Sequence, residues 1–274
     1  MTLRVRSVPS SSPGVLLAVE EAGPPGAPAV VLLHGFPLSR SMWEPQLAAL
    51  SGARRLIAPD ARGVGASDVG DGQATMELLV DDLFALLDAI QPGPVVGCGL
   101  SMGGYVLLRA LEREPERFRA AVLCDTRSEA DSDEGRLSRA AAIRRIREDG
   151  VGPFADGFLG QVLAPGTAAR DPELVARLRR LILANPPSGL RALLLAMATR
   201  TDTTPSLSRI AVPVLVLVGS EDALTPPAGA RAMAARIPGA RFEEIPGAGH
   251  LSNVEAPAAF GRALEAFLAS LDAS

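Results

Sequence analysis

The pentapeptide Gly-Leu-Ser-Met-Gly at residues 99–103 most constrains how this chain can fold. It stands between a short apolar run at 94–98, which predicts a buried strand, and residues 102–112, whose apolar spacing predicts a helix. The chain must reverse sharply between them, and Gly99, Gly103 and Gly104 leave room for that turn. Ser101 would then project at the carboxyl edge of a sheet, which marks it as a candidate nucleophile.

Short apolar runs alternate with helical patterns along most of the chain. Strands are predicted at 29–33, 55–58, 94–98, 120–124, 212–218 and 241–245, and helices at 76–90, 102–112, 227–237 and 254–271. Apolar strands joined by helices predict an α/β fold with a mostly parallel central sheet that helices cover on both faces. With 274 residues, 47% of them hydrophobic, the chain can bury one large core.

Residues 128–206 break this alternation. They are rich in Arg, Ala and Leu at helical spacing, are punctuated by Pro and Gly, and contain no strand pattern. We therefore predict an inserted bundle of about four helices. The expected organisation is a core domain of residues 1–127 and 207–274, with a helical cap at 128–206.

A serine nucleophile needs a base, and the base needs an orienting acid. His250 follows the strand predicted at 241–245, and Asp222 follows the one at 212–218. Their chain order after Ser101 is the order Ser, Asp, His of a strand–turn–helix serine hydrolase. We prefer Asp222 to Glu221 because of its place in the loop, and keep Asp125, after the strand at 120–124, as the alternative acid.

The other histidine of the chain, His34, begins the loop His-Gly-Phe-Pro after the strand predicted at 29–33. This loop should lie beside the turn at Ser101, so that the backbone N–H groups of Phe36 and Met102 form an oxyanion hole. Such a donor contributes about 3–4 kcal/mol to the transition state. We expect His34 itself to hold the loop by hydrogen bonding.

The substrate pocket is expected to be apolar. Its predicted lining residues are Phe36, Leu100, Met102, Phe154, Phe158 and Leu163.

The composition excludes several other classes. A net charge of −4 without a basic face argues against nucleic-acid binding, and no run of 18–20 apolar residues predicts a membrane span. The N-terminus lacks a signal-peptide pattern, so we expect a cytoplasmic protein in which Cys98 and Cys124 remain thiols. The absence of lysine rules out Schiff-base and Ser–Lys chemistry, and no His/Cys cluster predicts a metal site. Gly97 and Gly99 do not begin a dinucleotide-binding motif, because its third glycine would fall on Met102.

The loop at 34–37, the segment 60–67, the turn at 99–103, residues 219–222 and residues 249–250 together resemble the α/β-hydrolase superfamily over nearly the whole chain. Residues 98–104, 224–227 and 245–253 are most similar to the branch of 3-oxoadipate enol-lactonases and small carboxylesterases. The resemblance implies an α/β-hydrolase fold with a helical cap, a small-molecule ester or lactone as substrate, an acyl-enzyme intermediate and no cofactor. A homodimer is compatible with it.

Other activities of the same superfamily stay open at this stage. Haloalkane dehalogenases and epoxide hydrolases are disfavoured, because they carry an aspartate where this chain has Ser101. Cofactor-free haloperoxidases (perhydrolases), carbon–carbon bond hydrolases and slow-turnover ligand sensors remain alternatives.

Overall fold

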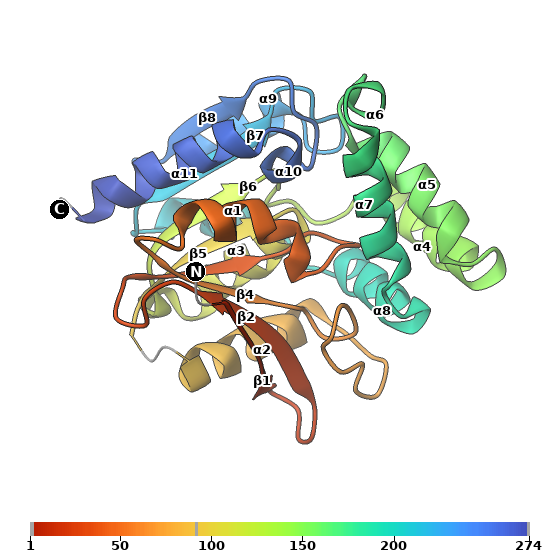
Figure 1. Cartoon of the computed structure of the whole chain (residues 1–274), viewed down its shortest axis with the longest axis horizontal. Helices are drawn as coiled ribbons and strands as arrows, with labels where there is room; N and C mark the ends of the chain where they lie inside the picture. The colour runs from red at the N-terminus through yellow and green to blue at the C-terminus, as the bar shows by residue number, and fades with distance from the viewer. Residues whose placement is uncertain (1–2, 91–92, 273–274) are drawn as a thin grey trace.

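An eight-stranded sheet forms the centre of the computed structural model, which describes residues 3–90 and 93–272 (Figure 1). Its strands are β1 (Leu3–Pro9), β2 (Leu16–Ala22), β3 (Ala29–Leu33), β4 (Arg55–Pro59), β5 (Val95–Leu100), β6 (Phe118–Cys124), β7 (Val214–Gly219) and β8 (Arg241–Ile245). The spatial order is β1-β2-β4-β3-β5-β6-β7-β8. Strands β3 to β8 are parallel to one another, whereas β2 is antiparallel to both β1 and β4. The predicted α/β fold with a mostly parallel sheet is confirmed.

Helices cover the sheet on both faces. Those of the core are α1 (Glu44–Leu50), α2 (Met76–Ile90), α3 (Met102–Arg113), α9 (Pro227–Ala234), α10 (Ser252–Glu255) and α11 (Pro257–Asp272), with 3-10 turns η1 (Arg40–Trp43), η2 (Pro115–Arg117) and η3 (Thr204–Arg209). Helices α1 and α11 pack together on one face, and α2 and α3 pack together on the other (Figure 1). Every residue of β3, β5 and β7 is buried, which explains why these strands are apolar runs without alternation.

Two features of the core differ from the sequence-based prediction. The single closing helix expected at 254–271 is divided into α10 and α11, because Pro257 lacks an amide hydrogen and begins a new helix. The β1–β2 hairpin was not predicted.

Cys98 and Cys124 are buried free thiols whose sulfur atoms lie 3.8 Å apart.

The chain between β6 and η3 forms a group of helices beside the sheet, drawn in green and teal in Figure 1. Its helices are α4 (Asp133–Glu148), α5 (Val151–Val162), α6 (Thr167–Arg170), α7 (Pro172–Leu183) and α8 (Pro187–Ala198). Four are long and α6 has only four residues. We call α4 to α8 the helical insertion and propose that it forms the predicted cap.

None of the helices in the described parts of the chain is by itself long and apolar enough to cross a membrane. Helices α7 and α8 reach the required length and composition only as a pair, across a bend of 94°.

The helical insertion is held against the core by close backbone packing and by one asparagine. A Cβ atom at Gly189, in α8, would lie only 1.7 Å from the carbonyl oxygen of Gly63. Asn185 accepts a hydrogen bond from the amide of Gly65 (2.7 Å) and donates one to the carbonyl of Pro37 (2.8 Å). The insertion therefore touches the loop at 34–37 that was predicted to border the site.

Replacing Gly189 by alanine should weaken this contact. We expect Gly189→Ala to lower the free energy of unfolding by about 1–3 kcal/mol, because the added methyl group meets backbone that cannot move freely. Gly160, in α5, has no atom within 4 Å of an added Cβ, so the matched control Gly160→Ala should gain about 0.5–1 kcal/mol of helix stability. Urea unfolding of both variants measures the difference. A Gly189→Ala protein as stable as Gly160→Ala would contradict the packing argument.

Candidate active site

Ser101 lies in a tight turn between β5 and α3. Its φ of 53° is uncommon for a residue other than glycine, and such a conformation costs about 1–3 kcal/mol. The turn is held by two hydrogen bonds: the amide of Ser101 donates to the carbonyl of Cys124 (2.9 Å), and the hydroxyl of Thr126 donates to the carbonyl of Ser101 (2.8 Å). The strained serine is thus supported by the last residue of the neighbouring strand β6 and by the chain that follows this strand.

Two glycines of the turn stand where backbone meets backbone. A Cβ at Gly99 would lie 2.3 Å from the carbonyl oxygen of Gly103, and one at Gly103 would lie 2.2 Å from that of Leu33. Neither backbone atom can move aside as a flexible side chain could. The turn therefore requires glycine at both positions.

Ser101, His250 and Asp222 form one hydrogen-bonded chain. His250 Nε2 lies 2.9 Å from Ser101 Oγ, and His250 Nδ1 lies 2.8 Å from Asp222 Oδ2. The carboxylate can only accept, so Nδ1 carries the hydrogen and Nε2 is left to accept the serine proton. All three side chains are buried, and the three segments predicted from the sequence meet at the carboxyl edge of the sheet.

The electrostatics of this chain keep Asp222 ionised. Burial disfavours its charge, but the hydrogen bond and positive charge of His250, together with the donors of Thr225, outweigh burial and lower the pKa of Asp222. Burial also disfavours a charged His250, and here the hydrogen bond and charge of Asp222 outweigh it and raise the pKa of His250. The arrangement therefore stabilises an imidazolium next to Ser101.

Thr225 was missed as a site residue in the sequence. Its hydroxyl donates to Asp222 Oδ2 (2.6 Å), and its amide and that of Leu224 donate to Asp222 Oδ1 (2.9 and 2.8 Å). These donors fill the lone pairs of Asp222 that do not face His250. The available signal was a threonine three residues after the acid, a spacing that allows a side chain to bond the backbone and carboxylate of its own turn.

The alternative acid, Asp125, occupies a different place. It is completely buried with a φ of 45°, and its carboxylate accepts from the amide of Gly219 (2.8 Å) and from the hydroxyl of Ser252. Burial, with the nearby charge of Asp222, raises the pKa of Asp125 to about 7. It forms no hydrogen bond with His250, whereas Asp222 does. Glu221 is exposed.

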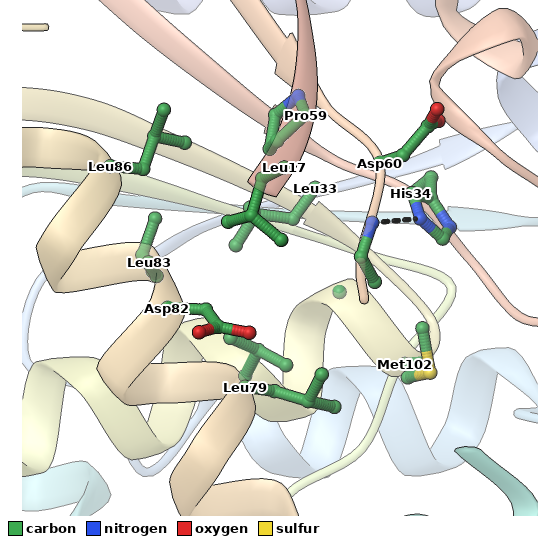
Figure 2. Close-up of a pocket in the computed structure, with 13 residues that line it drawn as sticks. Leu17, Leu33, His34, Pro59, Asp60, Leu79, Asp82, Leu83, Leu86 and Met102 are labelled. Carbon is green, nitrogen blue, oxygen red and sulfur yellow. Dashed lines mark hydrogen bonds between the residues drawn. The ribbon is translucent and has the colours of Figure 1, made fainter. Parts of the chain in front are cut away.

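His34 holds the loop at 34–37 against the chain that follows β4. Its Nε2 accepts from the amide of Ala61 (2.9 Å; Figure 2). Its Nδ1 lies 3.0 Å from the carbonyl of Gly35 and donates to it, because a carbonyl oxygen can only accept. Burial lowers the pKa of His34 despite the charge of Asp60, so the ring is neutral. A Cβ at Gly35 would lie 3.5 Å from that of Ser101, which places the loop beside the nucleophile.

A cavity of about 190 Å³ opens at Ser101. Three predicted pocket residues, Phe36, Phe154 and Phe158, line it as an aromatic cluster whose ring centres lie 5.9–6.2 Å apart. Phe154 and Phe158 are four residues apart in α5 and so share one face of that helix. The aromatic wall of the cavity therefore combines the loop at 34–37 with the helical insertion.

Three other predicted pocket residues do not line this cavity. Leu100 is completely buried in β5, and Met102 is buried at the start of α3, where it borders a separate cavity of about 50 Å³ beside His34 (Figure 2). Leu163 lies one residue beyond the end of α5, in extended backbone, and faces a hollow on the other side of that helix. Phe154 and Phe158 thus lie on the face of α5 that borders the cavity, and Leu163, past the helix end, does not.

The opposite part of the cavity is charged, which the apolar prediction missed. Asp131 is buried and bonds three arginines: Arg139, Arg200 (2.7 Å) and Arg127 (3.3 Å). Arg127, Asp131 and Arg139 line the cavity with Ser101. Burial opposes the charge of Asp131, but the bond to Arg139 and the charges of Arg139 and Arg200 lower its pKa, so one carboxylate faces three cations.

Known proteins with similar sequences and structures agree with this architecture. A sequence profile described as alpha/beta hydrolase fold matches residues 28–257. The chain is 32% identical over 241 residues to 3-oxoadipate enol-lactonase 2 of Acinetobacter baylyi, covering 88% of each chain. It is 31% identical to a Mycobacterium tuberculosis protein named as a candidate non-heme bromoperoxidase, covering 89% of this chain and 95% of that one.

The solved structure of a thermophilic esterase from Thermogutta terrifontis with bound malate superposes with a TM-score of 0.93 at 38% identity, over 98% of this chain and 99% of the esterase. Its overlap spans both the sheet and the helical insertion. By the profile, the sequence identity and the shared fold, the chain belongs to the alpha/beta hydrolase family.

Proposed function

We propose that the protein is a serine hydrolase that cleaves carboxylic esters or lactones of small substrates through an acyl-enzyme intermediate. The observation that carries this proposal is the hydrogen-bonded chain from Ser101 through His250 to Asp222 at the wall of a cavity. Relatives named as an enol-lactonase and an esterase support ester or lactone chemistry.

In the first half of the reaction, Ser101 Oγ attacks the carbonyl carbon while its proton passes to His250 Nε2, 2.9 Å away. Asp222 holds the ring through Nδ1 and stabilises the imidazolium that forms. The proton then moves from His250 to the leaving alkoxide. For a lactone the leaving group stays attached to the acyl chain, so the ring opens in this step.

The negative charge on the carbonyl oxygen needs donors that are already in place. We assign the amides of Phe36 and Met102 to this role. Met102 is the first residue of α3, where backbone N–H groups have no acceptor within the helix and the helix dipole favours negative charge. Water, activated by His250, then repeats the sequence and releases Ser101 and the acid.

The charged part of the cavity suggests a carboxylate on the substrate. Arg127 Nε is buried and has no hydrogen-bond partner among the described residues, and its other contact to Asp131 is long at 3.3 Å. A buried donor of this kind is costly unless something binds it. Both similar proteins are also named with a molecule that carries carboxylate groups: 3-oxoadipate for the enol-lactonase, and malate for the esterase structure. We propose that Arg127 binds a carboxylate of the substrate.

The role of Ser101 is tested by Ser101→Ala. We expect turnover of a short-chain 4-nitrophenyl ester to fall by at least about 10⁴-fold, because the nucleophile is lost. Circular dichroism should remain that of the wild type. Ser208, which is exposed in η3, provides the matched control Ser208→Ala with full activity. Near-normal hydrolysis by Ser101→Ala would end the proposal.

The choice of acid is tested by comparing Asp222→Asn with Asp125→Asn. The first variant should lose about 10⁴-fold in kcat, because the amide no longer fixes the ring tautomer. The second should lose less than about tenfold, because the amide oxygen can still accept from Gly219 and the amide NH₂ can donate to the Ser252 hydroxyl, which also accepts. Steady-state kinetics of both variants decide the question; equal losses would point to a shared role.

The pH dependence follows from the raised pKa of His250. The histidine acts as a base only when neutral, so kcat/KM should rise with pH through the pKa of His250. The midpoint is expected above the ordinary histidine value of about 6.5. A pH profile from 5 to 9 measures it, and a midpoint below that value would contradict the stabilisation of the imidazolium by Asp222.

The carboxylate preference is tested with monoethyl succinate and its neutral analogue ethyl pentanoate. Arg127→Gln should lower kcat/KM for the anionic ester by about 10- to 100-fold, as expected for a lost hydrogen bond to a charged group, and leave the neutral ester within about twofold. Arg136, exposed in α4, gives the control Arg136→Gln. Equal effects on both esters would show that Arg127 does not bind the carboxylate.

A second candidate activity is perhydrolysis, which the relative named as a candidate bromoperoxidase favours. The same serine would then pass its acyl group to hydrogen peroxide instead of water. From acetate the product would be peracetic acid, which oxidises added bromide to a brominating species and is itself reduced to acetic acid. Bromination of a dye with bromide, acetate and peroxide, compared with ester hydrolysis by the same preparation, separates the two activities. Bromination that is faster than ester hydrolysis would favour the perhydrolase.

A further inference from the structure

The carboxylate of Glu255, at the end of α10, bridges two segments that are far apart in the sequence. Its Oε1 accepts from the amides of Gly249 (3.1 Å) and Leu251 (3.3 Å), which flank His250 on both sides. Its Oε2 accepts from the amide of Ala164 (2.8 Å) and the hydroxyl of Thr167 (2.8 Å), both in the helical insertion. One carboxylate oxygen of Glu255 thus bonds only the loop that carries His250, and the other bonds only the helical insertion.

The two segments also touch directly through their backbones. The amide of His250 donates to the carbonyl of Val162 at 2.7 Å. A Cβ at Gly249 would lie 2.4 Å from the amide nitrogen of Ala164 and 2.6 Å from the carbonyl oxygen of Val162. The loop that carries His250 therefore lies on the end of α5 without any side chain between them.

Helix α5 is also the aromatic wall of the cavity at Ser101. Phe154 and Phe158 project from it toward Phe36, and Val162, its last residue, lines the same cavity. The position of this wall and the position of His250 consequently depend on one set of contacts.

We propose that Glu255 is a positioning residue that couples the helical insertion to His250, so that the nucleophile meets its base only when α5 lies against the loop at 249–251. This inference rests on the proposed function of His250. Glu255 touches neither Ser101 nor the cavity, and acts through the backbone on either side of the histidine.

The charge of Glu255 contributes in the same direction. The groups that raise the pKa of His250 against burial are Asp222, Asp125 and Glu255, in decreasing order. Removing the smallest of these charges should lower the pKa of His250 and move the acid limb of kcat/KM to lower pH. Disorder elsewhere in the fold would lower the amount of active protein without moving that limb.

The test begins with Glu255→Gln. The variant keeps the size of the side chain but leaves one segment facing an NH₂ group, which cannot accept. We expect kcat to fall by about 10- to 100-fold, because a small displacement of His250 from Ser101 slows the proton transfer. KM should change less than about threefold, because Glu255 does not line the cavity. Glu243, exposed in β8, gives the charge-matched control Glu243→Gln with wild-type kinetics.

Thr167→Val tests the insertion side alone. It removes one donor to Oε2 and leaves the amides beside His250 untouched, so it should lower kcat about threefold although Thr167 lies outside the cavity. Hydrogen exchange supplies a readout that needs no substrate: in both variants the amides of Ala164, Gly249 and Leu251 should exchange at least about tenfold faster, while the strands of the sheet keep their protection.

The outcomes separate the two proposals. Wild-type kcat, an unmoved acid limb and unchanged exchange in Glu255→Gln would overturn the role of Glu255. A wild-type protein without esterase activity, or an active Ser101→Ala variant, would instead overturn the proposed function. If Glu255→Gln does not fold, Thr167→Val decides, and wild-type kcat and exchange in that variant would refute the coupling.

Discussion

The close approach of backbone to backbone at the turn after β5 is the constraint on which the site depends. Gly99 and Gly103 let the chain fold back until carbonyl groups of α3 and β3 lie where side chains would otherwise be. Ser101 is thereby forced to a φ of 53°, and the strain is balanced by its hydrogen bonds with Cys124 and Thr126 and by the packing of the buried strands β3, β5 and β7. The hydroxyl, the start of α3 and the loop at 34–37 can then share one edge of the sheet.

The second requirement is to keep charge in a buried place. Asp222 remains ionised because each of its oxygens has donors: His250 and the hydroxyl of Thr225 on one, and two loop amides on the other. Asp125, equally buried, has two neutral donors and lies near the charge of Asp222, and its pKa is raised instead. Two carboxyl groups with opposite pKa shifts therefore stand near one imidazole, and the one with the lowered pKa, Asp222, is the one that bonds His250.

Much of this arrangement was predictable from the sequence, for a physical reason. Buried parallel strands are continuous apolar runs, so β3, β5 and β7 were recognisable, and the chain offered only two histidines as a base. The β1–β2 hairpin was not, because charged and apolar residues are mixed on these strands at the edge of the sheet. Glu255 was missed because it binds backbone amides, and no pattern of side-chain types shows where such amides point. Thr225 was missed because its partner is the acid of its own turn.

Three residues that escaped prediction, Asp131, Glu255 and Asn185, bond segments that are far apart in the sequence. Asp131 bonds Arg200, which is 69 residues away in the sequence, and Glu255 bonds the amide of Ala164, which is 91 residues away. Asn185 reaches the carbonyl of Pro37 across 148 residues. Local periodicity carries no information on such contacts, since each depends on how the insertion lies on the sheet. The motifs of an α/β-hydrolase core are therefore visible in the sequence, whereas the groups that we propose to bind a substrate carboxylate and to position His250 become visible only once the insertion is placed.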